Sequence, residues 1–248
     1  MTGVDVVVPV YNEEQALPRS IPVLREFLNS EAFPHRWRIV IADNASVDGT
    51  PEASRRLAEQ FPGEVVYVRL EETGRGRALK RTWSESPMEI VSYMDVDLST
   101  GLEAFPPLIS AIAEEGYELA VGSRLMAGSR VKRSAGRRLL TRGYSLIIKA
   151  MFQTRFSDAQ CGFKAVRTDV ARTLMPLIED DNWFFDTEML ILAEKAGYRV
   201  KDVAVAWVED FDTRVNVPKT IGEDMLGLAR MRRRRPWLAV RREAGGEA

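Results

Sequence analysis

The chain has 248 residues, of which 45% are hydrophobic and 29% charged, a composition that excludes disordered, collagen-like and disulfide-scaffold proteins. Its single cysteine, Cys161, allows no internal disulfide and is expected to be a buried small residue, and its single histidine, His35, excludes Ser-His-Asp and histidine-rich zinc chemistry. The N-terminus lacks the pattern of a signal peptide, and no apolar run approaches the ~18 residues of a membrane-spanning helix, which favours a cytosolic protein.

Charge is distributed unevenly along the chain, although 35 Lys and Arg nearly balance 36 Asp and Glu. Residues 119–157 carry nine basic side chains and no acid, and residues 225–242 carry seven more, again without an acid. The rest of the chain therefore has a net charge of −17. Such segregation indicates an anionic partner: a nucleic acid, a phosphate-bearing substrate or a membrane surface.

The first hundred residues alternate between strand and helix patterns. Continuous apolar runs predict buried parallel strands, and amphipathic stretches predict the helices between them. The predicted strands are 4–10, 38–42, 64–70 and 90–94, and the predicted helices are 17–28, 51–60 and 78–84. Farther along, 119–122 and 200–208 are predicted as strands. The alternation predicts an α/β fold with a mostly parallel central sheet and helices on both faces.

Polar or glycine-rich segments follow each of the first four predicted strands. They contain Asn12 and Glu13, then Asp43 and Asp48, then residues 74–77, and finally Asp95 and Asp97. Because ligands in open α/β sheets sit outside the carboxyl ends of the strands, we expect these segments to meet at one edge. Solvated loops would explain any one of them, but not all four.

Asp95 and Asp97 lie two residues apart at the end of the apolar run 90–94. Side chains of an extended segment alternate with a period of two, so the two carboxylates are expected on the same side. Mg²⁺ and Mn²⁺ take oxygen ligands and share them with substrate phosphates. The pair therefore predicts a site for a divalent metal and a diphosphate.

The order of motifs resembles a known enzyme family. Residues 8–14, 43–50, 74–76 and 95–97 resemble the family 2 glycosyltransferases, which implies the GT-A (Rossmann-like) fold. Residues 122–124, 157–164 and 183–188 are most similar to the dolichyl- or polyprenyl-phosphate β-glucosyltransferases, and next to the mannose-phosphate synthases. The resemblance predicts one domain over residues 1–220 and a basic C-terminal extension over 221–248. Within the domain, residues 1–100 would bind the nucleotide sugar and 101–220 the acceptor.

The resemblance also implies roles for individual residues. Asp43 would bind the uracil ring, although it could equally cap the turn at 46–50, and Arg75 and Arg77 would lie near the donor diphosphate. The nucleotide-sugar pocket would comprise Pro9, Tyr11, Glu13, Asp43, Asp48, Gly74, Arg75, Gly76, Arg77 and Asp95. The metal ligands would be Asp95, Asp97 and Gln160. The acceptor phosphate would contact Arg124, Arg133, Arg137, Arg138 and Arg142.

Asp97, Asp186 and Glu188 are the predicted catalytic residues. In the wider family an acidic residue at the position of Asp186 or Glu188 acts as a general base towards an acceptor hydroxyl. An acceptor phosphate is already largely ionised, with a second pKa of about 6, so these carboxylates could instead position a substrate. Acids at a helix N-terminus are also favoured simply by the helix dipole.

The basic segments are interpreted as membrane contacts. In the helix predicted at about 136–153, Leu140, Tyr144, Ile147 and Met151 form an apolar stripe, and Arg138, Arg142, Ser145 and Lys149 form the opposite one. This pattern is typical of an interfacial helix, and also of a helix packed on its own domain. The segment 230–237 fits a polybasic contact with Trp237 at the interface; a solvated tail is the alternative.

These observations lead to a functional hypothesis. The chain is expected to be an inverting, metal-dependent glycosyltransferase that moves glucose from UDP-glucose to a polyprenyl or dolichyl phosphate for cell-envelope glycans. It would act as a peripheral protein on the cytosolic face of the membrane. GDP-mannose, a UDP-N-acetylhexosamine, galactose or a soluble acceptor are alternatives. Nucleic-acid binding is disfavoured, because no reader helix or aromatic stacking platform is evident. The oligomeric state stays open.

Overall fold

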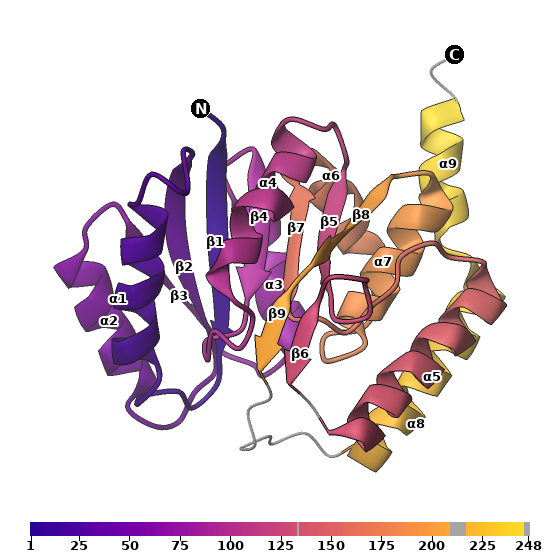
Figure 1. Cartoon of the computed structure of the whole chain (residues 1–248), viewed down its shortest axis with the longest axis horizontal. Helices are drawn as coiled ribbons and strands as arrows, with labels where there is room; N and C mark the ends of the chain where they lie inside the picture. Colours follow the sequence, from indigo (N-terminus) through magenta and orange to yellow (C-terminus); the bar gives the residue numbers. More distant parts are fainter. Residues whose placement is uncertain (133, 209–216, 246–248) are drawn as a thin grey trace.

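The computed structural model describes residues 1–132, 134–208 and 217–245 (Figure 1). Arg133, one of the predicted acceptor-phosphate residues, lies outside the described residues. In the part of the chain that is described, no helix combines the length and the apolar character needed to cross a membrane.

A mostly parallel sheet forms the centre of the molecule. In the described residues it has seven strands: β1 (Gly3–Val10), β2 (Arg36–Asn44), β3 (Val65–Leu70), β4 (Ile90–Met94), β5 (Leu119–Ser123), β7 (Phe163–Arg167) and β8 (Val200–Ala204). Their order in space is β3-β2-β1-β4-β7-β5-β8, and of these described strands only β7 is antiparallel to its neighbours. A separate parallel pair joins β6 (Arg130–Lys132) to β9 (Ala206–Val208).

Helices cover both faces of the sheet, as predicted. They are α1 (Leu17–Leu28), α2 (Thr50–Gln60), α3 (Arg75–Glu85), α4 (Phe105–Ala113), α5 (Ala135–Phe152), α6 (Thr168–Leu174), α7 (Phe185–Ala196), α8 (Val217–Arg234) and α9 (Trp237–Gly245), with 3-10 turns at Leu102–Ala104 and Met175–Leu177. Because successive strand residues point to opposite faces, two cores form. Val6 and Val8 pack with α1, α2 and α4, whereas Val7 and Tyr93 pack with α3 and with α5 to α9.

The predicted fold class is confirmed, and the first four strands and first three helices lie within three residues of their predicted ends. Two features differ from the prediction. The predicted strand at 200–208 is divided at Val205 into β8 and β9, which belong to different sheets. Residues 163–167 form β7, which the sequence pattern does not indicate because Lys164 and Arg167 interrupt its apolar character.

The C-terminal helices pack against the same core as the sheet. Leu228 and Met231 of α8 and Trp237 and Val240 of α9 are buried, and the Trp237 ring meets Phe152 edge-on at 6.1 Å between centroids. The expectation that Trp237 lies at a membrane interface is therefore wrong, because its ring is buried in the core beside Phe152. The domain boundary predicted between residues 220 and 221 falls inside α8.

Helix α5 lies on the domain with a different face from the one its pattern suggests. Thr141, Ser145, Ile148 and Phe152 are buried, although the sequence pattern places Ser145 on the exposed polar stripe. The Ser145 hydroxyl donates to the Ser157 carbonyl at 2.7 Å, which satisfies it in the interior. Because α5 buries this other face, apolar side chains are exposed on its outer side: Leu139, Leu140, Leu146 and Ile147.

Candidate functional site

The loops after β1 and β2 are bound to each other at the carboxyl edge of the sheet. The Asn12 amide donates to the Ser46 hydroxyl at 3.0 Å, and the Glu13 amide donates to the Thr50 hydroxyl at 2.7 Å. Asp48 Oδ1 accepts the backbone amide of Thr50, the first residue of α2, at 2.9 Å. These contacts hold together the two loops in which the nucleotide pocket is predicted. Two further predicted residues lie there, with Pro9 partly buried at the end of β1 and Tyr11 exposed.

Asp43 is completely buried, and both of its carboxylate oxygens are in use. One oxygen accepts the Ser46 amide at 2.9 Å. The other accepts the Tyr67 hydroxyl at 2.8 Å and an Arg69 nitrogen at 3.0 Å. The turn-capping alternative for Asp43 is thus realised in this structure.

The glycines at 74 and 76 allow α3 to approach the loop before α7. Gly74 has a φ of +147°, and a Cβ at Gly76 would come within 2.7 Å of the Phe185 Cβ. Arg77 is tied to the same loop, because its guanidinium bonds Asp181 at 3.0 Å and also contacts Glu72. Lys80 adds a contact to Asp181 at 2.9 Å. In this structure, Gly76 and Arg77 therefore position α3.

Asp95 and Asp97 follow β4 directly, as predicted, but their surroundings differ. Asp97 is exposed and its Oδ1 accepts the Ser99 amide at 2.9 Å. The Asp95 carboxylate lies against Gly162, where any Cβ would clash with it, and 3.7 Å from an Arg75 nitrogen. Desolvation raises the pKa of Asp95, the Arg75 charge opposes this, and the negative charges of Asp97 and Asp186 raise it further. A cation bound here would relieve that repulsion.

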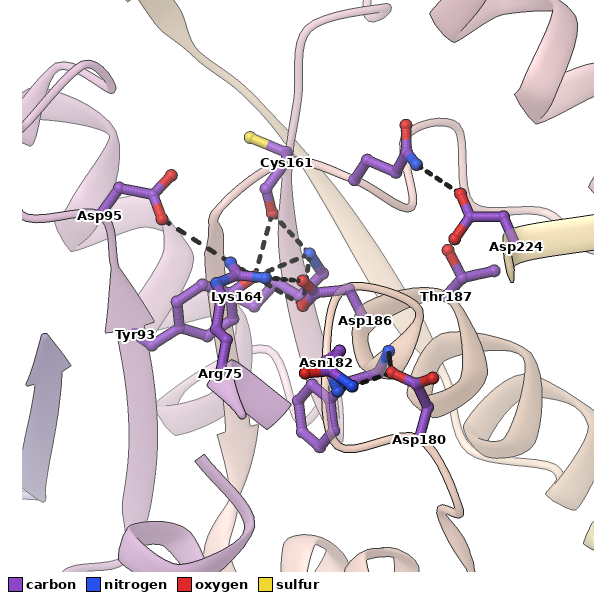
Figure 2. Close-up of polar contacts among 12 residues, drawn as sticks. Arg75, Tyr93, Asp95, Cys161, Lys164, Asp180, Asn182, Asp186, Thr187 and Asp224 are labelled. Atoms are coloured by element: carbon purple, nitrogen blue, oxygen red, sulfur yellow. Dashed lines mark hydrogen bonds and ion pairs between the residues drawn. The ribbon is translucent and has the colours of Figure 1, made fainter. Parts of the chain in front are cut away.

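Arg75 and Asp186 belong to one buried polar cluster, shown in Figure 2. Asp186 Oδ2 accepts an Arg75 nitrogen at 2.6 Å, and Asp186 Oδ1 accepts the Tyr93 hydroxyl at 2.5 Å. The Lys164 ammonium lies 3.0 Å from the same Oδ1. Burial acts to raise the pKa of Asp186, but the charges of Lys164 and Arg75 and the Tyr93 bond outweigh it, so the pKa is lowered.

Gln160 makes its side-chain contact away from the two aspartates. Its amide nitrogen donates to Asp224 Oδ2 of α8 at 2.9 Å. Figure 2 shows Asp224 and Asp95 on opposite sides of Cys161. Within the described residues, no group of three His, Cys, Asp or Glu side chains is placed to hold a metal ion. Asp95 and Asp97 stay candidate protein ligands, and substrate phosphates and waters would complete a Mg²⁺ or Mn²⁺ site.

Glu188 lies next to Asp186 in α7 but has different partners. Its buried carboxylate accepts the Asp180 amide at 2.9 Å and an Arg230 nitrogen of α8 at 2.7 Å. Burial raises the pKa of Glu188, although these two contacts oppose the rise. The side chain joins α7 to α8, and the contacts that the structure describes give it no link to Asp95 or Arg75.

Three of the predicted acceptor-phosphate arginines line one hollow of about 170 Å³ between β6 and α5. Arg124 is held there by a two-pronged contact with Asp158 at 2.8 and 3.0 Å. Arg138 and Arg142 line the same hollow, and neither has a carboxylate partner among the residues the structure describes. The remaining lining includes Leu125, Met126, Ser129, Val131 and Thr141. Arg137 is partly buried nearby on α5 and is not part of this lining.

Two residues of the buried cluster were missed by sequence reasoning. Tyr93 precedes Asp95 by two residues, so the same period of two that pairs Asp95 with Asp97 also predicts Tyr93 on that side. Lys164 is completely buried on β7, where it stands directly opposite Tyr93. A lysine among the apolar residues of Phe163–Val166 could have indicated a charged partner in the interior, because a buried lysine almost always has one.

Known proteins resemble this chain in both sequence and fold. The chain is 32% identical over 239 residues to the glycosyltransferase AglD of Haloferax volcanii, which covers 96% of this chain and 38% of that protein. It is 30% identical over 215 residues to the dolichyl-phosphate β-glucosyltransferase of Dictyostelium discoideum, which covers 82% of this chain and 66% of that protein. The chain therefore spans less than two thirds of the length of either relative.

A solved structure and a family model agree with these relatives. Glucosyl-3-phosphoglycerate synthase from Mycobacterium tuberculosis, in complex with Mn²⁺ and UDP-glucose, superposes with a TM-score of 0.66 at 14% identity, covering 93% of this chain and 79% of that one. This match shows that the two chains share a fold. The model of glycosyl transferase family 2 matches residues 5–175, which is more than half of the sequence. The chain belongs to glycosyl transferase family 2.

Proposed function

We propose that the protein transfers glucose from UDP-glucose to a polyprenyl phosphate, with inversion at the sugar C1. One oxygen of the acceptor phosphate forms a bond to C1 on the face opposite UDP. The bond between C1 and the β-phosphate oxygen breaks, and its electron pair leaves with UDP. The naming of the Dictyostelium discoideum relative as a dolichyl-phosphate β-glucosyltransferase supports glucose and a lipid phosphate as substrates.

The donor would bind at the carboxyl edge of β1 to β4. Arg75, which also lies near Asp95, presents a cation to the donor diphosphate, where charge-assisted hydrogen bonds are strong. Asp95 and Asp97 would hold a divalent cation. Desolvation is the main cause of the raised pKa of Asp95, and the nearby negative charges of Asp97 and Asp186, which a divalent cation would offset, add to it. When bound, such a cation stabilises the negative charge of the UDP leaving group.

The acceptor phosphate would bind in the hollow between β6 and α5, and this hollow is the observation that carries the proposal. It combines the cations Arg138 and Arg142, which have no carboxylate partner among the described residues, with the apolar side chains Leu125, Met126 and Val131. A phosphate bound to a hydrocarbon chain needs both kinds of lining. A doubly charged phosphate ester also needs little help from a base, since its second pKa is about 6.

The protein would reach its acceptor from the membrane surface. Helices α5 and α8 lie side by side (Figure 1), and both expose large apolar side chains. We call these side chains the α5–α8 surface; they are Leu139, Leu140, Leu146 and Ile147 on α5 and Ile221, Met225 and Leu226 on α8. Apolar side chains exposed next to arginines are typical of helices that bind at an anionic bilayer interface. Peripheral association with the cytosolic face of the membrane is therefore proposed.

A donor screen tests the proposed function. Purified protein is incubated with a polyprenyl phosphate, Mn²⁺ or Mg²⁺, and a panel of UDP- and GDP-sugars that includes glucose, galactose, N-acetylglucosamine and mannose. We expect UDP-glucose to give a glucosyl-phosphate lipid, identified by mass, with the β configuration established by NMR. Product formed from GDP-mannose alone would replace the proposed donor. Product formed only with a soluble acceptor would overturn the lipid assignment.

A further inference from the structure

Lys164 is a fully buried lysine with no role in the reaction proposed above. It lies in β7, opposite Tyr93 of β4, with no exposed surface. Its ammonium donates to the Cys161 carbonyl at 2.5 Å and to the Tyr93 hydroxyl at 3.2 Å, and it lies 3.0 Å from Asp186 Oδ1. Burying an ammonium is costly unless it is paired and hydrogen-bonded. All three of its contacts satisfy that need within one cluster.

Asp186 is surrounded by donors on both carboxylate oxygens. Its Oδ1 receives the Tyr93 hydroxyl and the Lys164 ammonium, and its Oδ2 receives the Arg75 guanidinium at 2.6 Å. Asp186 itself is only 2% exposed. A general base must reach the proton that it removes. Here the carboxylate faces three protein donors, and almost none of its surface is accessible to an incoming acceptor.

Arg75 is held from several directions by the same groups. A second guanidinium nitrogen donates to the Tyr93 hydroxyl at 3.0 Å, and its charge lies 4.9 Å from the centre of the Tyr93 ring and 5.0 Å from that of Trp183. The guanidinium also lies 3.7 Å from Asp95. Arg75 therefore connects the buried cluster to Asp95, as Figure 2 shows, and Asp95 is a candidate metal ligand.

The charges of the cluster explain why two cations are present. If Asp186 faced Arg75 alone, the two charges would cancel, and Arg75 would offer little attraction to a diphosphate. Lys164 supplies a second positive charge beside Asp186, so that Arg75 does not balance the Asp186 charge alone, and the other carboxylate near Arg75 is Asp95 at 3.7 Å. Tyr93 bonds to all three of the charged groups and fixes their spacing.

We propose that Lys164 and Asp186 form a positioning pair that, with Tyr93, holds Arg75 at the donor diphosphate, and that Asp186 does not act as a base towards the acceptor. This inference rests on the proposed function for the identity of the donor. Asp186 and Lys164 therefore influence donor binding only by holding Arg75 in place.

A double-mutant cycle on UDP binding tests this assignment. UDP affinity is measured by calorimetry with Mn²⁺ for the wild type, Arg75→Gln, Asp186→Asn and the double variant. We expect each single variant to weaken UDP binding about 10-fold, and the double variant to be within about twofold of Arg75→Gln, because neighbours that act through one group are not additive. Independent losses that multiply to about 100-fold would overturn the proposal, as would unchanged binding in Asp186→Asn.

Turnover separates positioning from base catalysis. If Asp186 acts only through Arg75, adding Asp186→Asn to the Arg75→Gln enzyme changes kcat by less than about twofold. A base would cost a further 100-fold or more, about the usual contribution of proton transfer, in both backgrounds. Lys164→Arg is expected to restore UDP affinity lost in Lys164→Met. Equal affinities of these two variants would also contradict the proposal.

Two further variants guard against loss of the fold. Asp186→Asn leaves Lys164 without a counter-charge, so the cycle is repeated with Lys164→Met and Asp186→Asn together, which removes both buried charges. Asp5→Asn is the matched control, because Asp5 is 1% exposed and its ion pair with Arg38 lies at the other end of β1. Its UDP affinity is expected to equal that of the wild type. Since UDP binding requires no acceptor, a failed lipid assay leaves the cycle interpretable, whereas a wild type that does not bind UDP overturns both proposals.

Discussion

At the residue scale, the two aspartates after β4 have surroundings that suit different tasks. Asp95 lies between Gly162, Arg75 and the negative charges of Asp97 and Asp186, whereas Asp97 is exposed and bonds the Ser99 amide. A cation held between the two would meet a partly exposed carboxylate on the Asp95 side and a more exposed one on the Asp97 side. Asp97 can therefore be changed with little effect on the core.

Asp97→Ala is predicted to abolish metal-dependent turnover while the fold survives. Removing one of two carboxylate ligands is expected to lower kcat/KM at least about 100-fold, because metal stabilisation of the leaving group is lost. Initial rates over a Mn²⁺ titration measure the loss, and circular dichroism checks the fold. The metal assignment fails if this variant keeps near-normal activity in the presence of a chelator.

Asp224 shows how a single buried carboxyl couples stability to pH. Desolvation is the main cause that raises the pKa of Asp224 to about 6, and the negative charges of Asp180 and Glu223 also raise it. Hydrogen bonds from Tyr144 and Gln160 act in the opposite direction and lower this pKa. Since this pKa is above the ordinary value of 3.8, the folded state binds the proton more tightly than the unfolded state. Stability is therefore lost as the pH rises from about 4 to about 6.

Asp224→Asn is predicted to raise the free energy of unfolding at neutral pH by about 1–3 kcal/mol, because the asparagine carries no charge to desolvate. The difference from the wild type should disappear below about pH 4, where Asp224 is protonated in both states. Urea denaturation at a series of pH values measures this. The same difference at about pH 4 and about pH 7 would show that the charge of Asp224 is not its cause.

At the scale of elements, α5 and α8 combine an inner face that packs with an outer face that remains apolar. Asp224 of α8 bonds Gln160, and Gly227 brings α8 so close to Phe184 that a Cβ there would lie 2.5 Å from the ring. The two helices are therefore fixed to the core independently of any membrane. Leu146 and Leu226 nevertheless remain 66% and 73% exposed, so these two large apolar side chains do not contribute to that packing.

Leu146→Asp combined with Leu226→Asp is predicted to weaken binding to anionic vesicles at least about 10-fold, since it places charge on the α5–α8 surface. UDP affinity should not change. Vesicle co-sedimentation measures the binding. Val23→Asp is the control, because Val23 of α1 is 52% exposed on the opposite side of the sheet. Equal loss in the control would point to non-specific binding.

Charge reversal in the hollow tests the acceptor site separately. Arg138→Glu combined with Arg142→Glu should raise KM for the polyprenyl phosphate at least about 10-fold and change KM for the donor little, because two phosphate contacts are lost. A short-chain, water-soluble polyprenyl phosphate serves as substrate, so that vesicle binding does not limit the rate. Arg55→Glu with Arg56→Glu on α2 is the matched control. Unchanged acceptor KM would remove these arginines from the site.

At the scale of the whole molecule, the basic C-terminal helices are part of the main core. Leu228, Met231, Trp237 and Val240 belong to the same buried cluster as Tyr93 and Phe185. Arg230 and Arg234 are held by acids of the domain: Arg230 contacts Glu188 and Glu179, and Arg234 contacts Glu179 at 2.5 Å. Part of the positive charge in this segment is therefore used to attach α8.

Trp237→Ala is predicted to lower the free energy of unfolding by about 3–5 kcal/mol, because it leaves a cavity beside Phe152. Urea denaturation followed by circular dichroism measures the loss, with Leu238→Ala as the control, since Leu238 is 41% exposed in the same helix. A change below about 1 kcal/mol would mean that α9 does not contribute to the core.

The order of the first βα units, and the polar segment after each of the first four strands, could be predicted from the sequence alone. Both are local properties: strand and helix periods are written in neighbouring residues, and parallel strands bring their carboxyl ends to one edge. Asp95 and Asp97 could be paired in this way. The order of the motifs along the chain was also enough to indicate family 2.

The side chains that those segments contact depend on how distant parts of the chain pack together. The insertion of β7 between β4 and β5 places Lys164 opposite Tyr93, and α7 then brings Asp186 to Arg75, which lies 111 residues earlier. The exposed side of α5 was also undetermined, because apolar residues occur on both of its faces. Strand pairing and burial depend on contacts between distant segments, whose free energies no local pattern contains.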